Sequence, residues 1–538
     1  MEKRVLIAIA LSFALLGFYP FVLEKFYPGY SSSKSVSSKP AAVNLASPET
    51  THLKSSPLDP AAFSEKEDIV FKNDSLKLLF NQRSGAIRGI SFREFIDYRE
   101  NIPLTFLSLG ENTGAPTALR FLEGVATDEK LSHYEMRQSS ENTLEATALG
   151  DKLKVTKKYV FKKGGYDAAL NIVFENLSSA PVELRYELFA GSSVPPRHSI
   201  DRQYIEANFY SKIQDKEVLR HIRESKQGKI VTSDGPIEWV AIKDRHFSVI
   251  VKPKSEGAYT GNVEGLGHEN FNASLVSPRI VAPAGGSISH EFLLYIGPNQ
   301  IERLEPLGLG PVVNFGRLDW IGKLLVGTLE LLNKIFRNYG LAIIVLTALI
   351  NLLFFPLTRL SFMSMKRMQD VQPQVAKLRE QHKNSPEKIN KEMMGLYKKH
   401  KVNPFGGCLP LVIQMPIFMA LYVALSKTVV LIDSKLFWIK DLSSPDDVSL
   451  PFALPFLGAT IHLLPVIMIG AMVVQQKFTQ VSMASQDPTM QMQQKMMAFM
   501  MPIVFGFIFY TMPSGLVLYW LTNTVIMTAY QFYLKRTH

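Results

Sequence analysis

The sequence of 538 residues contains a single cysteine, Cys408, so it can form no internal disulfide and no cysteine-rich metal site. It also lacks the Gly-x-x-x-x-Gly-Lys-Ser/Thr phosphate loop, so no motif points to nucleotide hydrolysis. The composition, with 46% hydrophobic and 20% charged residues, excludes a collagen-like or wholly disordered chain. The length exceeds what one compact core accommodates and therefore indicates several domains.

Charged residues are absent from five long intervals, each near or above the roughly 20 residues that a helix needs to cross a bilayer. These intervals are 5–23, 338–358, 402–426, 448–476 and 496–534. The turn residues Pro513-Ser514-Gly515 divide the last one into two. A single interval would fit a buried core helix, but five in one chain argue against that interpretation. We therefore predict a multi-domain membrane protein with six transmembrane α-helices.

The first interval follows Lys3 and Arg4, a pattern that also fits a cleavable signal peptide. It ends in bulky aromatic residues rather than in the small residues of a cleavage site. We interpret residues 1–30 as an N-terminal transmembrane anchor. Residues 31–67, rich in Ser, Pro, Ala and Lys, are typical of a flexible linker.

The distribution of Lys and Arg predicts the orientation of the spans. Basic residues precede the first span, fill the segment between the second and third spans, and follow the last span. Six crossings place all three sites on one side, the cytoplasm, together with the N-terminus. The loop 427–447, which carries four Asp, then lies outside.

Residues 68–315 fall on the outer side, and they alternate apolar and polar residues in short runs separated by Gly, Asn, Pro and Ser. This pattern predicts a large periplasmic antiparallel β-sandwich. No catalytic constellation is evident in it. We interpret Asp244-Arg245-His246 as a surface turn, because adjacent side chains of a strand point to opposite faces.

Residues 316–337 form a predicted amphipathic helix, and the five charged residues from Leu318 to Arg337 share one face. Ile321, Leu325, Leu329, Leu332 and Phe336 lie away from that face. We expect this helix to rest at the membrane interface with its apolar side toward the acyl chains. The alternative is a soluble helix that packs on the sandwich.

Residues 362–401 have the composition of two basic helices joined by a short turn. We predict a cytoplasmic helical hairpin that is a solvated determinant of topology, a docking site for an acidic or RNA-rich partner, or both. The docking residues would be Lys366, Arg367, Lys377, Arg379, Lys398 and Lys399.

Several motifs in the C-terminal part of the chain resemble one known family. Asn403-Pro404-Phe405-Gly406-Gly407-Cys408-Leu409-Pro410 and Gln414-Met415-Pro416-Ile417-Phe418 resemble the third span of the YidC/Oxa membrane protein insertases. Pro356-Leu357-Thr358, Asp487-Pro488 and the segment from Pro513 to Trp520 resemble other spans of that family. The resemblance covers residues 316–538, and the anchor and the β-domain point to the Gram-negative YidC form.

This resemblance implies a five-helix insertase core at 338–538 in a bacterial inner membrane. Such a core encloses a hydrophilic groove that admits the polar segment of a substrate, while the apolar segment moves along the third and fifth spans. We call this apolar surface the slide. By the resemblance, it would include Met415, Pro416, Phe418, Leu421, Ile503, Ile508 and Met512. Plain lipid contact or helix packing fits most of these residues equally well.

The family usually places an arginine in the second span, and the matching position here is Asn351. Uncharged polar residues of the spans still predict a wet groove, because such residues face protein or water rather than lipid. The predicted groove residues are Thr347, Asn351, Gln414, Tyr519, Thr522 and Asn523. The alternative for Asn351 and Gln414 is hydrogen bonding between helices.

We therefore predict an insertase and chaperone for nascent membrane proteins that is not an enzyme and uses no cofactor or metal. Its expected partners are the lipid bilayer, a ribosome or targeting factor at the hairpin and C-terminus, and a Sec translocon. A secondary transporter or channel is the alternative, although the spans contain no Asp, Glu, Lys or Arg, His462 alone is a poor proton relay, and no internal repeat is evident. A carbohydrate-active enzyme would need a cleft with paired carboxylates in the β-domain.

Overall fold

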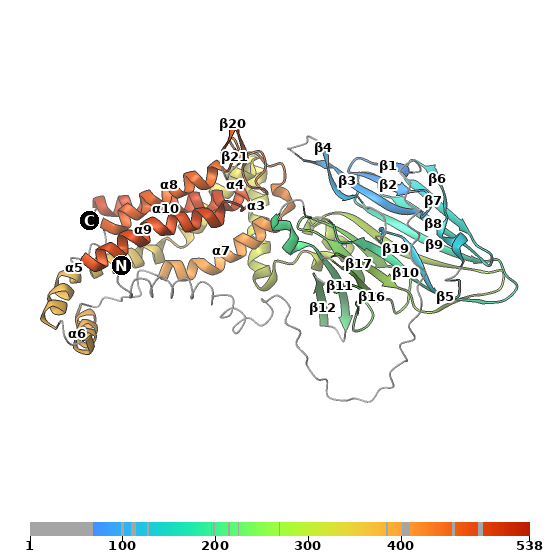
Figure 1. Ribbon diagram of the computed structural model, residues 1–538, viewed down its shortest axis with the longest axis horizontal. Coiled ribbons are helices and arrows are strands. Elements are labelled where there is room, and N and C mark those ends of the chain that lie inside the picture. Colours follow the sequence, from blue (N-terminus) through green and yellow to red (C-terminus); the bar gives the residue numbers. More distant parts are fainter. Residues whose placement is uncertain are drawn as a thin grey trace. The chain divides into compact units, whose positions relative to one another are not determined.

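The structure is a computed structural model, and it describes residues 68–97, 102–108, 114–125, 128–194, 196, 199–213, 216–223, 225–267, 270–382, 386–400, 409–454, 458–481 and 488–537. The predicted anchor at 1–30 and the predicted linker at 31–67 lie outside these residues. Strands make up the first part of the described chain and helices the second (Figure 1).

The strands form antiparallel sheets, which confirms the predicted sandwich class. One sheet has the order β1 (Asp68–Lys72), β2 (Leu76–Asn81), β3 (Ala86–Asp97), β4 (Ile102–Ser108). A second has the order β13 (Ile230–Thr232), β16 (Thr260–Gly267), β17 (Asn270–Val276), β10 (Val182–Ser192), β18 (Ile280–Ala282), with β5 (Leu119–Glu123) paired to β10. The largest has the order β12 (Lys216–Ile222), β11 (Glu206–Ile213), β14 (Trp239–Lys243), β15 (Phe247–Pro253), β19 (Ser287–Pro298), β9 (Asp167–Asn176), β8 (Leu153–Phe161), β7 (Thr143–Leu149), β6 (Glu135–Ser140).

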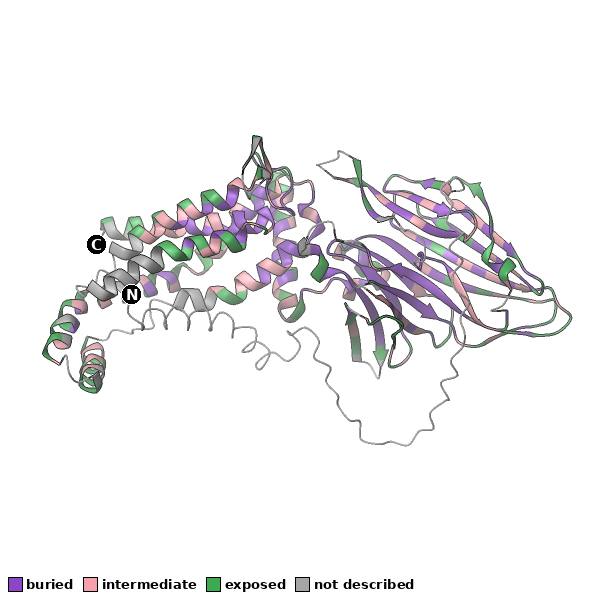
Figure 2. Cartoon of the chain, viewed as in Figure 1, coloured by how far each residue is buried: buried purple, intermediate pink, exposed green. Residues whose placement is uncertain are grey.

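The sheets pack face to face through the apolar residues that alternate along each strand. In β8 every second side chain is buried, as the period of a half-buried strand requires. Phe92 of β3 stacks on Phe247 of β15 with ring centroids 4.1 Å apart, which joins the first sheet to the largest one. All residues of β14 and the first five of β15 are buried. Buried residues run along many strands of the sandwich (Figure 2).

The helices follow the last strand of the sandwich. They are α2 (Ile301–Leu304), α3 (Asp319–Phe336), α4 (Tyr339–Leu353), α5 (Phe355–Gln381), α6 (Pro386–Lys399), α7 (Leu409–Lys427), α8 (Leu463–Val481), α9 (Pro488–Phe509) and α10 (Ser514–Thr537). A short antiparallel pair, β20 (Val448–Leu454) and β21 (Gly458–Ile461), precedes α8. The predicted turn at Pro513 separates α9 from α10.

The predicted second span, 338–358, is not one helix. Asn338 caps α4 by accepting a hydrogen bond from the backbone N–H of Leu341, and α4 ends at Leu353. Pro356 lies in the first turn of α5, where its missing N–H is tolerated. Because proline cannot continue α4, the chain bends by 60° between the two helices. Within the described residues, only this bent pair has the length and apolar composition of a membrane crossing, and no single helix does.

The amphipathic helix α3 has two apolar sides rather than one. Leu325, Leu329 and Leu332, which we expected to face lipid, are buried and pack against apolar residues of α4 and α7. A second stripe, turned away from that side, is exposed instead: Trp320, Leu324, Leu331 and Ile335. The sequence pattern alone separated charged from apolar residues but could not show which apolar side meets protein.

The predicted hairpin is present as the end of α5 and the whole of α6, which pack together through Val371 and Val375. Its first arm is continuous with the end of the predicted second span, so the boundary at 362 lies inside α5 rather than at a helix end. The predicted turn at 384–385 lies outside the described residues.

Candidate functional site

Asn351, in the last turn of α4, is the centre of a polar cluster between helices. Its side-chain Nδ2 donates to the backbone oxygen of Thr347 at 2.8 Å and to Oδ1 of Asn523 on α10 at 3.0 Å. Asn523 is 9% exposed, and Thr522 beside it is partly exposed. The amide pair therefore joins α4 to α10.

A second amide contact joins α7 to α10. Nε2 of Gln414 lies 3.4 Å from the hydroxyl of Tyr519, whose ring is buried in the helical core. Thr347 is also fully buried, but its hydroxyl donates to the carbonyl of Ile343 within α4. Thr347, one of the six predicted groove residues, is therefore buried, and its hydroxyl is bonded within its own helix.

Asn351 and Gln414 line one small open cavity, with room for about one water molecule. Its other lining residues come from α4, the bend, α5, α7 and α10: Ile350, Phe354, Leu357, Thr358, Ile417 and Met527. The bend at Phe354 thus forms part of the wall. Two uncharged amides in a mainly apolar wall could bind water or a polar chain segment, but they could neither bind a metal tightly nor carry out acid–base catalysis.

The structure spreads the predicted slide residues over three environments. Met415 and Pro416 on α7 and Ile503 and Ile508 on α9 are exposed. Phe418 and Met512 are partly exposed, and Phe418 packs edge-on to Trp520 of α10 with centroids 5.0 Å apart. Leu421 is 1% exposed and belongs to the helical core, so a passenger cannot reach it in this structure.

The predicted docking residues lie on the outside of the α5–α6 hairpin. The side chains of Lys366, Arg367, Lys377, Lys398 and Lys399 are exposed, while that of Arg379 lies outside the described residues. Nε2 of His382 lies 3.1 Å from a carboxylate oxygen of Glu392, which links the two arms. The hairpin therefore presents cations to its surroundings.

The segment Asp244-Arg245-His246, which we interpreted as a surface turn, is buried, so that interpretation is wrong. All three residues are at most 5% exposed. Arg245 donates to the carbonyl oxygens of Ser426, at the end of α7, and Ser443 in the following loop, the latter at 2.7 Å. The turn is covered because the helical core packs on this edge of the sandwich.

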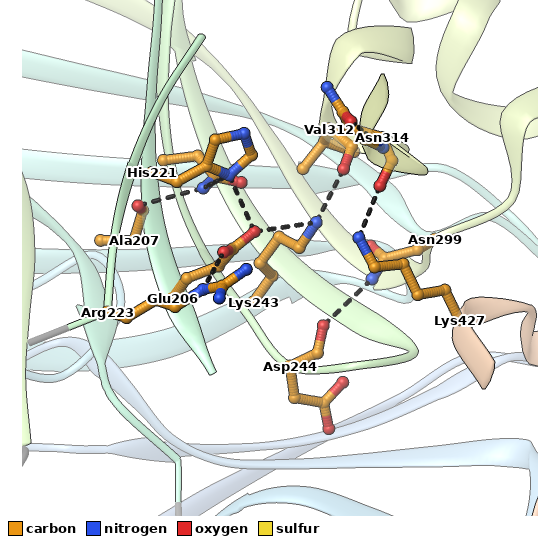
Figure 3. Close-up of polar contacts among 12 residues, drawn as sticks. Glu206, Ala207, His221, Arg223, Lys243, Asp244, Asn299, Val312, Asn314 and Lys427 are labelled. Atoms are coloured by element: carbon orange, nitrogen blue, oxygen red, sulfur yellow. Dashed lines mark hydrogen bonds and ion pairs between the residues drawn. The ribbon is translucent and has the colours of Figure 1, made fainter. Parts of the chain in front are cut away.

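A second charged cluster surrounds the buried Glu206 at the start of β11 (Figure 3). Its carboxylate lies 3.0 Å from Nδ1 of His221, 3.1 Å from Nε of Arg223 and 3.4 Å from Nζ of Lys243. Burial raises the pKa of Glu206, but Lys243, His221 and Arg223 together outweigh burial and hold this pKa well below its ordinary value. Glu206 is therefore a structural anion.

Two lysines reach backbone carbonyls between the sandwich and α3. Lys243 donates to Val312 at 2.8 Å, and Lys427 at the end of α7 donates to Asn314 at 2.6 Å (Figure 3). With Arg245, these contacts connect the sandwich to the end of α7. Sequence reasoning missed this connection because its partners are distant along the chain. One signal of this connection was present in the sequence. The first four residues of β14 are apolar, and the charged residues Lys243, Asp244 and Arg245 follow them directly.

Comparison with known proteins gives consistent matches along the chain. Residues 331–538 match the family described as 60Kd inner membrane protein, and residues 68–328 match the YidC periplasmic domain. The membrane protein insertase YidC of Syntrophus aciditrophicus (strain SB) is 31% identical, over 100% of both chains. That of Pelobacter propionicus is 32% identical, over 100% of this chain and 99% of the relative. A solved structure of an active YidC insertase covers 88% of this chain and 93% of its own, at 20% identity and a TM-score of 0.40.

Proposed function

The chain belongs to the YidC family of inner-membrane protein insertases, and from this premise we propose that the cavity between α4, α5, α7 and α10 receives the polar segment of a nascent membrane protein. The observation that carries the proposal is the pair of amides, Asn351 and Gln414, in the wall of one open cavity. The protein would act as an insertase and chaperone rather than as an enzyme, because the described lining of the cavity offers binding groups and no nucleophile or acid–base pair.

The physical basis is the free-energy cost of moving polar groups through hydrocarbon. An unsatisfied polar group in an apolar medium costs several kcal/mol. Asparagine and glutamine each offer two N–H donors and one carbonyl acceptor, so they can retain water or bind the backbone of a polar segment. A cavity with such groups would lower the free-energy cost of moving the passenger's polar segment, and this would require no nucleotide hydrolysis.

Within the described part of the chain, no charged residue lines the cavity, which distinguishes it from the usual family pattern at Asn351. A fixed cation would favour acidic segments by Coulomb attraction. Neutral amides instead favour any hydrated segment, whatever the sign of its charge. We therefore propose that this chain selects passengers by polarity more than by charge.

The exposed apolar residues of α7 and α9 would receive the apolar part of the passenger. Met415, Ile503 and Ile508 are each more than one third exposed. Methionine and branched aliphatic side chains form a soft, adaptable surface that suits many different sequences. In this proposal the slide consists of these residues with Pro416, Phe418 and Met512.

We further propose the six-span topology with a cytoplasmic N-terminus, in which the α5–α6 hairpin extends into the cytoplasm. Its exposed lysines would attract an RNA-rich or acidic partner such as a ribosome or targeting factor. The basic C-terminus would contribute to the same contact, and a Sec translocon remains an expected partner.

The test compares two substitutions one turn apart on α4. Asn351→Leu removes an amide from the cavity wall, whereas Thr347→Val removes a hydroxyl that bonds only within its own helix. Both proteins are reconstituted in liposomes, and insertion of single-span substrates with polar or apolar translocated tails is measured. We expect Asn351→Leu to slow the polar-tailed substrates selectively, and Thr347→Val to leave the ratio between the two substrates unchanged. Equal effects of Asn351→Leu on both substrates, at normal protein levels, would remove this cavity from the mechanism.

A further inference from the structure

A two-residue hairpin turn projects from the loop between α7 and α8. The backbone N–H of Leu436 donates to the oxygen of Ile439 at 3.0 Å, and the N–H of Ile439 donates back at 2.9 Å. Phe437 and Trp438 form the tip. Phe437 is 83% exposed, close to the highest exposure of any large apolar side chain among the described residues.

The backbone of Phe437 has a φ of +53°, a conformation that residues with a side chain rarely adopt. In two-residue hairpins, the central positions with positive φ favour glycine, asparagine or aspartate. A turn that only had to reverse the chain in water would contain one of those residues. A large aromatic ring at this position instead indicates that the ring itself has a role.

The tip is held rigidly by the helical core. Leu436 and Ile439, on either side of it, are 6% and 1% exposed. Gly340 in the first turn of α4 lets Leu436 approach closely, because a Cβ there would lie 2.7 Å from the Leu436 side chain. Asn338 donates from Nδ2 to the carbonyl of Lys435 at 3.0 Å. The aromatic tip therefore cannot fold back to bury itself.

Trp438 has its polar group satisfied by the protein. Its indole Nε1 donates to Oδ2 of Asp446 at 3.0 Å, while 36% of the residue remains exposed. Its ring lies beside that of Phe437, with centroids 6.3 Å apart. Tryptophan with one polar edge and one apolar face is the residue enriched at the boundary between water and lipid.

Two cations flank the aromatic tip, since Lys435 and Lys440 are both exposed. Lysines next to apolar residues place their stems along the acyl boundary and their ammonium groups among lipid phosphates. Leu341, which follows Gly340 in α4, is also exposed, at 41%. Charge and apolar surface thus both match a phospholipid interface.

We propose that the Phe437–Trp438 turn inserts into the phospholipid interface and fixes the depth of α4 and of the loop after α7. This inference concerns membrane contact and does not depend on the insertion cavity. It uses the proposed topology only to assign the turn to the outer leaflet.

The single cysteine of the chain makes a direct test possible. Cys408→Ser removes it, insertion activity is checked, and Phe437→Cys is then introduced and labelled with a nitroxide. The protein is reconstituted in liposomes of phosphatidylethanolamine and phosphatidylglycerol. Collisions of the label with oxygen, which concentrates among acyl chains, are compared with collisions with a water-soluble nickel chelate.

Two sites provide references. Leu353→Cys on α4 is 73% exposed within the predicted second span, and Glu141→Cys on the β6–β7 turn is exposed on the sandwich. We expect the label at 437 to resemble the label at 353, with high oxygen and low nickel accessibility. Nickel accessibility as high as at 141 would overturn the proposal, and so would low accessibility to both reagents, which would indicate contact with protein.

A measurement without a label guards against distortion of the turn. Brominated acyl chains quench tryptophan fluorescence on contact, so Trp438→Phe should remove a quenched component that the wild-type protein shows. No difference between the two proteins would overturn the proposal. Labelling of Glu141→Cys on intact cells with an impermeant thiol reagent reports the topology separately, so an error in orientation is distinguishable from absence of insertion.

Discussion

Replacement of Arg245 by methionine should uncouple the sandwich from the helical core. The Arg245 guanidinium is 1% exposed, lies 3.2 Å from the Asp201 carboxylate, and donates to the carbonyls of Ser426 and Ser443. Methionine has a similar length but no charge and no donor. Arg245→Met therefore deprives a buried carboxylate and two buried carbonyls of this donor at once.

The magnitude follows from the burial of the pair. Removing one partner of a buried ion pair destabilises a protein by about 3–5 kcal/mol, whereas an exposed pair contributes about 0–1 kcal/mol. Arg223 provides a matched control, because it lies 3.1 Å from Glu206 in a similar pair but its side chain is 58% exposed. Glu206 also keeps Lys243 and His221 when Arg223 is replaced.

The assay is thermal unfolding of the purified full-length chain in detergent, followed by near-UV circular dichroism. For a domain of this size, each kcal/mol corresponds to about 2–4 °C in Tm, so Arg245→Met should lower Tm by about 6–20 °C and Arg223→Met by less than about 4 °C. Equal shifts for the two variants would show that the buried contacts of Arg245 do not hold the sandwich to the core.

Two further predictions concern the stability of the same regions. The pKa of Glu206 is held well below 4.5, so the ionised carboxylate stabilises the fold above about pH 4.5, and this stabilisation is lost as the pH falls through the folded-state pKa. Glu206→Gln should therefore flatten the loss of Tm in acid. An unchanged dependence of Tm on pH would contradict this assignment. Gly340→Ala places a Cβ 2.7 Å from the Leu436 side chain and should lower the free energy of unfolding by about 1–3 kcal/mol. Gly470→Ala in α8 is the control, because its Cβ meets open space and the substitution should be neutral or slightly stabilising. Equal shifts in Tm for the two variants would refute the close packing at Gly340.

Much of the fold could be predicted because it follows from local pattern. Apolar and polar residues alternate at 154–161 and 182–189, a pattern that predicts strands, and the structure contains these strands as β8 and β10. The bend between α4 and α5 was missed, although Pro356 was recognised, because hydropathy measures composition and not helix direction. The exposed stripe of α3 was also missed. This helix has one charged face and two apolar faces, and only the neighbouring helices decide which apolar face is buried.

For the candidate site, the sequence predicted which polar residues lie in apolar helices, but not which side chains face one another. Asn351 and Gln414 stood out as polar residues in apolar intervals, and both line the cavity. Leu421 looked equivalent to Met415 in sequence, but the two differ in their direction around α7. Arg245 was misread because its partners on the helical side, Ser426 and Ser443, are distant along the chain and use backbone carbonyls, which carry no sequence signal.

The loop after α7 ties the neighbouring helices together at one end. The hydroxyl of Ser514, at the start of α10, donates to the carbonyl of Ser444 at 2.7 Å, and the carboxylate of Asp446 accepts from the backbone N–H of Leu464 at the start of α8. Arg245 holds the same loop to the end of α7. These contacts bind the end of α7 and the starts of α8 and α10 to one loop.

The cavity lies far from these tied ends along three of the helices that line it. Most of α4 separates Asn351 from the cap at Asn338, and similar lengths of α7 and α10 separate Gln414 from Ser426 and Met527 from Ser514. At about 1.5 Å per residue, each separation is about 18–20 Å. The three helices thus place the cavity at a common depth, with the bend at Phe354 beside it. In the proposed function, a polar segment in this cavity would still have helices of that length ahead of it, so the cavity would shorten the apolar distance that a passenger crosses.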